Sequence, residues 1–85
     1  MSCQLDFDLT VNGNDVTVTS HISPPGFQTP PTITNSGSLI TITYGDDPAG
    51  PVNDTQIVPI NGATEVEVEV ESQGRKKCTN KKHIK

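Results

Sequence analysis

The sequence contains no tryptophan, and only 4% of its 85 residues are aromatic. Hydrophobic residues of all kinds make up 31% of the chain. This is too little apolar material to build both a packed core and a deep internal pocket in one small domain. No cluster of histidine, cysteine, aspartate or lysine has a recognisable catalytic spacing. The sequence therefore does not indicate an enzyme.

Basic residues are missing from the first 74 positions. All six Lys and Arg residues lie in residues 75–85, and all ten Asp and Glu residues come before Ser72. An acidic body of about −10 and a basic end of about +6 thus add to the net charge of −4. Such an asymmetry is typical of an interaction tail on an oppositely charged body. It disfavours nucleic-acid binding by the whole domain, because the body repels phosphate.

Long apolar runs are also missing, so neither a transmembrane helix nor a signal peptide is expected. A cytoplasmic protein, a component of an assembly and a processed extracellular domain all fit the sequence. Cys3 and Cys78 are the only cysteines. They are free thiols if the protein is cytosolic. In an oxidising compartment, a bond between them closes a loop of about 75 residues and stabilises the fold by about 4–5 kcal/mol.

Apolar and polar residues alternate along most of the chain, which predicts strands, and no segment has helical spacing. Residues 3–22 predict a β-hairpin around Asn12-Gly13, the dipeptide most typical of a two-residue turn. A turn centred on that dipeptide gives the pairs Leu9–Val16, Phe7–Val18, Leu5–Ser20 and Cys3–Ile22.

Further strands are predicted at 32–34, 39–44, 56–60 and 64–72. Residues 23–31 hold four prolines and predict a loop. Pro59 places its strand at an edge or a bulge. Five to seven short strands predict a small antiparallel β-sandwich over residues 1–72, followed by a basic, partly disordered tail over 73–85.

Three segments carry a family resemblance: residues 40–45 (ITITYG), 55–60 (TQIVPI) and 65–72 (EVEVEVES). They resemble a middle strand, the last strand but two and the strand after it in fibronectin type III-like or immunoglobulin-like sandwich modules. The family's core Trp and corner Tyr are missing, and Val66 stands where that Tyr would be. The resemblance implies a sandwich that binds partners or spaces other domains.

Two charged patterns are candidate binding features. Alternate carboxylates about 6.6 Å apart along one strand face would suit a cation or a basic partner. The same row is also typical of a solvated face that blocks aggregation at a sheet edge. The basic end would contact an anionic partner, act as a flexible end or fold back on the acidic face. The residues are Glu65, Glu67, Glu69 and Glu71 in the row, and Arg75, Lys76, Lys77, Lys81 and Lys82 in the basic end.

The loops offer other candidates. Phe27 is an aromatic anchor candidate in the proline-stiffened 23–31 loop, since a pre-ordered loop loses less entropy on binding. Oxygen ligands gather at Asp46, Asp47, Asn53 and Asp54, but their spacing matches no calcium loop. A zinc site from His21, His83, Cys3 and Cys78 is not indicated, because the C-x4-H spacing of Cys78 and His83 is a weak signal on its own. No metal or cofactor is therefore predicted.

These observations predict a non-enzymatic protein-interaction or structural module with a protein partner and weak self-association. The alternative is a small inhibitor or ligand-binding protein that presents the 23–31 loop.

Overall fold

The computed structural model describes residues 4–23, 26–45, 47, 49–71 and 78–84, and within them the chain forms seven strands and no helix. The all-β prediction is thereby confirmed. A three-stranded sheet has the order β1-β2-β5, and a four-stranded sheet has the order β3-β4-β6-β7. The strands are β1 (Gln4–Asn12), β2 (Asp15–Ser23), β3 (Thr32–Asn35), β4 (Leu39–Gly45), β5 (Asn53–Pro59), β6 (Glu65–Glu71) and β7 (Cys78–His83).

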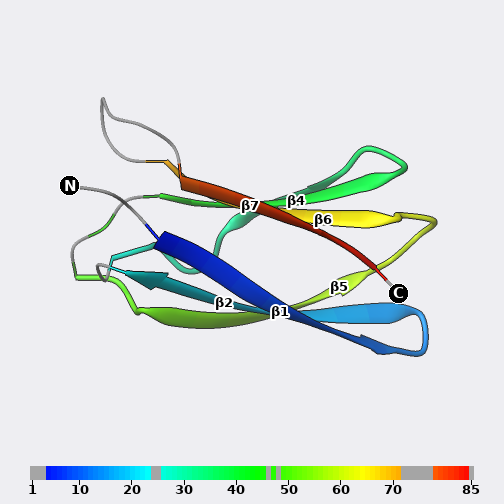
Figure 1. The fold of residues 1–85 in the computed structure, drawn as a ribbon, viewed down its shortest axis with the longest axis horizontal. Helices are drawn as coiled ribbons and strands as arrows, with labels where there is room; N and C mark the ends of the chain where they lie inside the picture. Colours follow the sequence, from blue (N-terminus) through cyan, green and yellow to red (C-terminus); the bar gives the residue numbers. More distant parts are fainter. Residues whose placement is uncertain (1–3, 24–25, 46, 48, 72–77, 85) are drawn as a thin grey trace.

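The two sheets form the two layers seen in Figure 1, with β1, β2 and β5 below β4, β6 and β7. Alternate residues of β2, β4 and β6 point into the space between the layers, as the period of two predicts. One core joins both sheets. Its fully buried apolar residues are Phe7, Val16, Val18, Phe27, Ile40, Ile42, Tyr44, Val66 and Val68.

The β1–β2 hairpin forms, but the predicted register is wrong. The turn is centred on Gly13 and Asn14, so Leu9 lies opposite Val18 rather than Val16. Gly13 has a φ of +62°. A turn with glycine at its first central position is the type II′ hairpin turn, which twists in the same sense as the strands. The pairing moves by two residues, and this keeps every apolar side chain on the expected face.

The expectation of an antiparallel sandwich is wrong at one place, because β4 and β6 are parallel neighbours. The strand between them in sequence, β5, lies in the opposite sheet. The chain leaves β4, crosses to the other layer, returns along β5 and crosses back. It thus enters β6 at the end where β4 began, and the two strands run the same way.

The expectation of a partly disordered tail is wrong for β7, which pairs antiparallel with β6. Residues 72–77 lie outside the described residues. The inward positions of β7 include Asn80 and Lys82, where a core strand would carry apolar residues. Lys82 Nζ donates to the Phe7 carbonyl (2.5 Å), lies 3.0 Å from Asp6 Oδ1 and stands 5.2 Å from the Phe7 ring centroid. Asn80 Nδ2 donates to the Leu5 carbonyl over 3.1 Å.

These contacts close one side of the sandwich, because β1 and β7 are edge strands of different sheets. The Lys82 side chain pairs with the Asp6 carboxylate, and this partner lowers the pKa of Asp6. We call the strands β1 and β7 the closed side.

Deleting residues 78–85 is expected to destroy cooperative unfolding, or to lower Tm by more than about 10 °C. The deletion leaves the β6 backbone without its neighbour and uncovers Phe7. Thermal unfolding followed by circular dichroism measures the effect. Full-length Cys78→Ser is the control that separates loss of the strand from loss of the cysteine. A truncated protein that melts like the full chain would contradict this role of β7.

Candidate functional site

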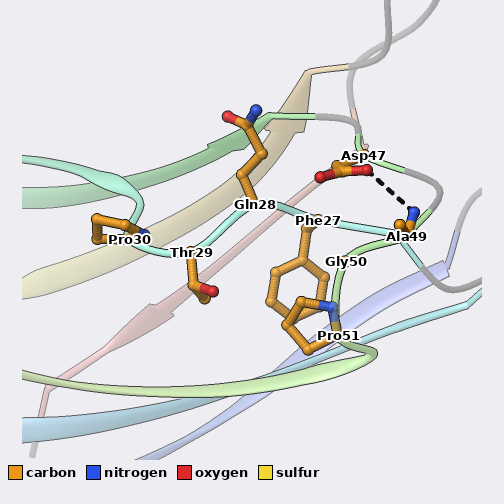
Figure 2. Close-up of a pocket in the computed structure, with 8 residues that line it drawn as sticks. All are labelled: Phe27, Gln28, Thr29, Pro30, Asp47, Ala49, Gly50 and Pro51. Atoms are coloured by element: carbon orange, nitrogen blue, oxygen red, sulfur yellow. Dashed lines mark hydrogen bonds between the residues drawn. The ribbon is translucent and has the colours of Figure 1, made fainter.

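At one end of the sandwich, the loops after β2 and β4 border an open pocket of about 470 Å³ (Figure 2). Backbone bonds tie the two loops together. Gln28 N donates to the Gly45 carbonyl (3.0 Å), and Asp47 N donates to the Gly26 carbonyl (3.4 Å). The lining residues are Phe27, Gln28, Thr29, Pro30, Asp47, Ala49, Gly50 and Pro51.

A tight turn at Asp47 shapes the second of these loops. The Asp47 carboxylate accepts from Ala49 N (3.0 Å), and the Asp47 carbonyl accepts from Gly50 N (2.8 Å). This is the local pairing that aspartate favours in turns. Gly50 then passes so close to the Phe27 backbone that a Cβ at position 50 would overlap the Phe27 carbonyl. One wall of the pocket is therefore formed where the Gly50 and Phe27 backbones are in direct contact.

Phe27 is a core residue, and the interpretation of this side chain as an exposed anchor is wrong. It is fully buried, and its ring meets the Tyr44 ring edge-on with centroids 4.4 Å apart. In Figure 2 the Phe27 side chain points away from Gln28, down beside Pro51. In a chain with so few aromatic residues, both rings serve the core.

A polar contact crosses between the layers beside these rings. The Tyr44 hydroxyl donates to Asp54 Oδ2 (2.7 Å), and Gln56 Nε2 donates to the same oxygen (2.7 Å). Burial, and then the bond to Asp54, raise the pKa of Tyr44. Ser20 Oγ is buried beside them, and within the described residues it has no hydrogen bond of normal geometry. The closeness of the Ser20 hydroxyl to Tyr44 partly opposes the rise in the Tyr44 pKa.

The acidic row and the basic end meet as neighbouring strands. Glu65 lies opposite His83 and Glu67 opposite Lys81 in the β6–β7 register. The Glu65 and His83 side chains approach to 3.5 Å. On the other flank of β6, Thr43 Oγ1 donates to Glu69 Oε1 over 3.0 Å. The row is thus flanked by partners on both neighbouring strands, whereas Arg75, Lys76 and Lys77 lie outside the described residues.

The candidate metal ligands separate in the structure. Asp54 points inward to Tyr44, and Asp47 bonds its own turn. Asn53 lies on the outer face of the three-stranded sheet, while Asp46 is outside the described residues. Within the described residues no three His, Cys, Asp or Glu side chains gather as metal ligands. Cys78 is disulfide-bonded. Cys3 lies outside the described residues, so the bond between these two cysteines stays a prediction.

His21 forms a polar cluster across three strands. Its Nδ1 lies 2.6 Å from Asn53 Oδ1, and its Nε2 lies 3.3 Å from Asp8 Oδ2. The bond to Asn53, and then the bond to Asp8, raise the pKa of His21. The side chain is about half exposed, and both partners are at the surface. The cluster therefore fastens β1, β2 and β5 together on their outer face.

Sequence reasoning missed one feature of the surface. Within the described residues four large apolar side chains are exposed, and three of them lie on or beside β3 and β5: Ile33 (39%), Val52 (41%) and Ile57 (68%). We call the strands β3 and β5 the open side. Pro59 did mark β5 as an edge, but no sequence signal placed β3 and β5 on the same side.

The chain matches no protein-family model, no curated protein and no solved structure. Within the described residues, no helix has the length and apolar composition needed to cross a membrane.

Gly50→Ala is expected to destabilise the protein by about 1–3 kcal/mol, because the new methyl group overlaps backbone that cannot rotate away. Urea unfolding measures the loss. Ala49→Ser is the control, since this neighbouring side chain is exposed. Equal stability of Gly50→Ala and the parent would contradict the backbone contact.

The pKa of His21 is expected to lie above 6.5 in the folded protein, which NMR titration of its ring protons measures. The contribution to stability is full below the unfolded pKa and is lost as pH rises through the higher folded pKa. Asp8→Asn and Asn53→Ala should each lower the folded pKa of His21. Asp15→Asn, at the far end of β2, is the control. An unchanged pKa in both partner variants would disprove the cluster.

Proposed function

We propose that this chain is a non-enzymatic protein-interaction module of the fibronectin type III-like or immunoglobulin-like sandwich type, and that it binds through its open side. The observation that carries the proposal is the contrast between the two sides of the sandwich. One side is closed by polar contacts between its edge strands, and the other leaves its edges and apolar side chains exposed.

The closed side is an unsuitable docking surface. Its inward polar groups are already paired, since Lys82 and Asn80 bond to β1. Its outward positions carry charge, with Asp6 and Asp8 on β1 and Lys81 on β7. Charged edges are a common means of preventing contact with another strand.

The open side has the opposite character. All four residues of β3 are exposed, because the four-stranded sheet extends one strand beyond the three-stranded sheet. Asn35 Nδ2 donates to the Ile60 carbonyl (3.1 Å), which holds the end of β3 beside the end of β5. The two strands contain no Lys, Arg or Glu, and their one charged residue, Asp54, is bonded inward to Tyr44.

Such a surface suits a protein partner. An edge strand offers backbone donors and acceptors to an added strand, and apolar side chains next to it supply contact area. In this proposal the acidic row faces the basic strand β7 on one sheet face, and the partner is bound elsewhere.

A second candidate function is ligand binding in the pocket between the 26–30 and 47–51 loops. The observation that favours it is the network of backbone bonds that pre-orders both loops. In this role Phe27 supports the pocket from the core, and Gln28, Thr29 and Asp47 would contact the ligand.

The test is site-specific photo-crosslinking in extract from the native source, with products identified by mass spectrometry. A photoreactive residue at Ile33 or Ile57 should capture a protein partner. The same residue at Thr10, on the outer face of β1, should not. Capture only from Thr29 would favour the pocket instead, and capture only from Thr10 would refute the proposal.

A further inference from the structure

The backbone of β5 presents alternate residues to its neighbour β2 and to open solvent. Just beyond its two ends, Ile60 N donates to the Asn14 carbonyl (2.9 Å) and the Val52 carbonyl accepts from Ile22 N (3.0 Å). Both contacts continue the β2–β5 register. Even-numbered residues of β5 therefore bond to β2, and odd-numbered residues point their backbone groups outward.

Prolines limit this outward edge at both ends. Pro51 and Pro59 occupy outward positions, and neither has an N–H group. Between them the outward donors are Asn53, Thr55 and Ile57. Within the described residues no backbone bond uses these three N–H groups. The two prolines stand at equal distances from Thr55, so the pattern of donors is symmetric about that residue.

We infer that two copies of this chain pair through β5, antiparallel, about a two-fold axis at Thr55. This inference rests on the proposed function of the open side and names its partner. Thr55 faces Thr55 of the second copy, and Asn53 faces Ile57. Three donors from each copy then make six backbone bonds. Each Pro51 faces Pro59 of the second copy, so the ladder ends where donors are lacking.

The side chains are compatible with the same register. On the inner face Asp54 lies opposite Gln56 of the second copy, so no carboxylate faces a carboxylate and each meets an amide donor. On the outer face Thr55 meets its equivalent, a favourable cross-strand pair. Ile57, the most exposed large apolar residue described, gains cover. The resulting interface is isologous, as closed two-fold dimers require.

The other edges fit a second copy less well. β1 and β7 carry outward charges and are bonded to each other across the closed side. In β3, Ser36 N donates to the Leu39 carbonyl, so the even-numbered residues of β3 bond to β4. Only Ile33 and Asn35 therefore point their backbone groups outward.

A seam of one strand pair is smaller than a standard interface, so the dimer is weak. Its Kd is expected between about 10 µM and 1 mM.

The test combines sedimentation equilibrium with amide hydrogen exchange measured by NMR at rising protein concentration. The amides of Asn53, Thr55 and Ile57 should become at least fivefold slower to exchange as the dimer forms. The amides of Asp54, Gln56 and Val58, which bond to β2, should be protected throughout. Added salt should strengthen the dimer, because each copy has a net charge of −4.

Two variants locate the interface. Thr55→Pro removes the central outward N–H group. Like Pro59, position 55 points its backbone groups away from β2, so no bond to β2 is lost. This variant should weaken the dimer at least tenfold. Ile57→Lys places a charge on the edge and should do the same. Thr17→Lys adds an identical charge to the same face one strand further in, and it should leave the dimer intact. Protection of the β2-bonded amides reports that each variant is folded.

A protein that stays monomeric to about 1 mM, or a dimer that persists in a folded Ile57→Lys variant, would overturn the inference. If the monomer still yields a different protein in crosslinking from Ile33 or Ile57, the proposed function stands and only the choice of partner fails. If neither self-association nor any crosslink at the open side is found, both fail.

Discussion

Lys82 makes the contact that an apolar side chain makes in most sandwiches. Its ammonium group lies between the Asp6 carboxylate, the Phe7 carbonyl and the Phe7 ring. The methylene stem can cover the core while the charged head reaches the margin. Because the chain has so little apolar material, this placement lets a polar strand complete a hydrophobic interior. Lys82 thereby joins β7 of the four-stranded sheet to β1 of the other sheet and covers Phe7.

The strands that the sequence predicts well are those with one solvent-facing side and one buried side. β2, β4 and β6 alternate strictly, so their period and their inward residues were both available from the sequence. The hairpin register was not, because Asn12-Gly13 and Gly13-Asn14 are both good turns. The structure has the turn with glycine first. Since the two registers differ by two residues, the hydrophobic pattern could not distinguish them.

β7 and the parallel pair were missed for different reasons. The inward residues of β7 are polar, and their partners on β1 lie more than 70 positions away in sequence. A pattern within one segment cannot reveal such partners. The parallel neighbours β4 and β6 follow from the path of β5 through the other sheet, which is a property of chain connections. For the candidate site, Phe27 was recognised as unusual, but its position in a proline-rich loop suggested exposure. The Tyr44 ring that buries it comes from another strand.

The contact between β1 and β7 joins the first and the last strand described, and this affects the order of assembly. Contacts between residues so distant in sequence must overcome a large loop-closure entropy, so they form late and slow the folding of a small β-protein. During synthesis, β1 can form its hairpin with β2 early, but its other flank stays uncovered until β7 has emerged. When residue 74 has been added, all ten carboxylates and no Lys or Arg have been made. This stretch of 85 residues thus carries its greatest negative charge before β7 can cover β1, and mutual repulsion opposes aggregation at that stage.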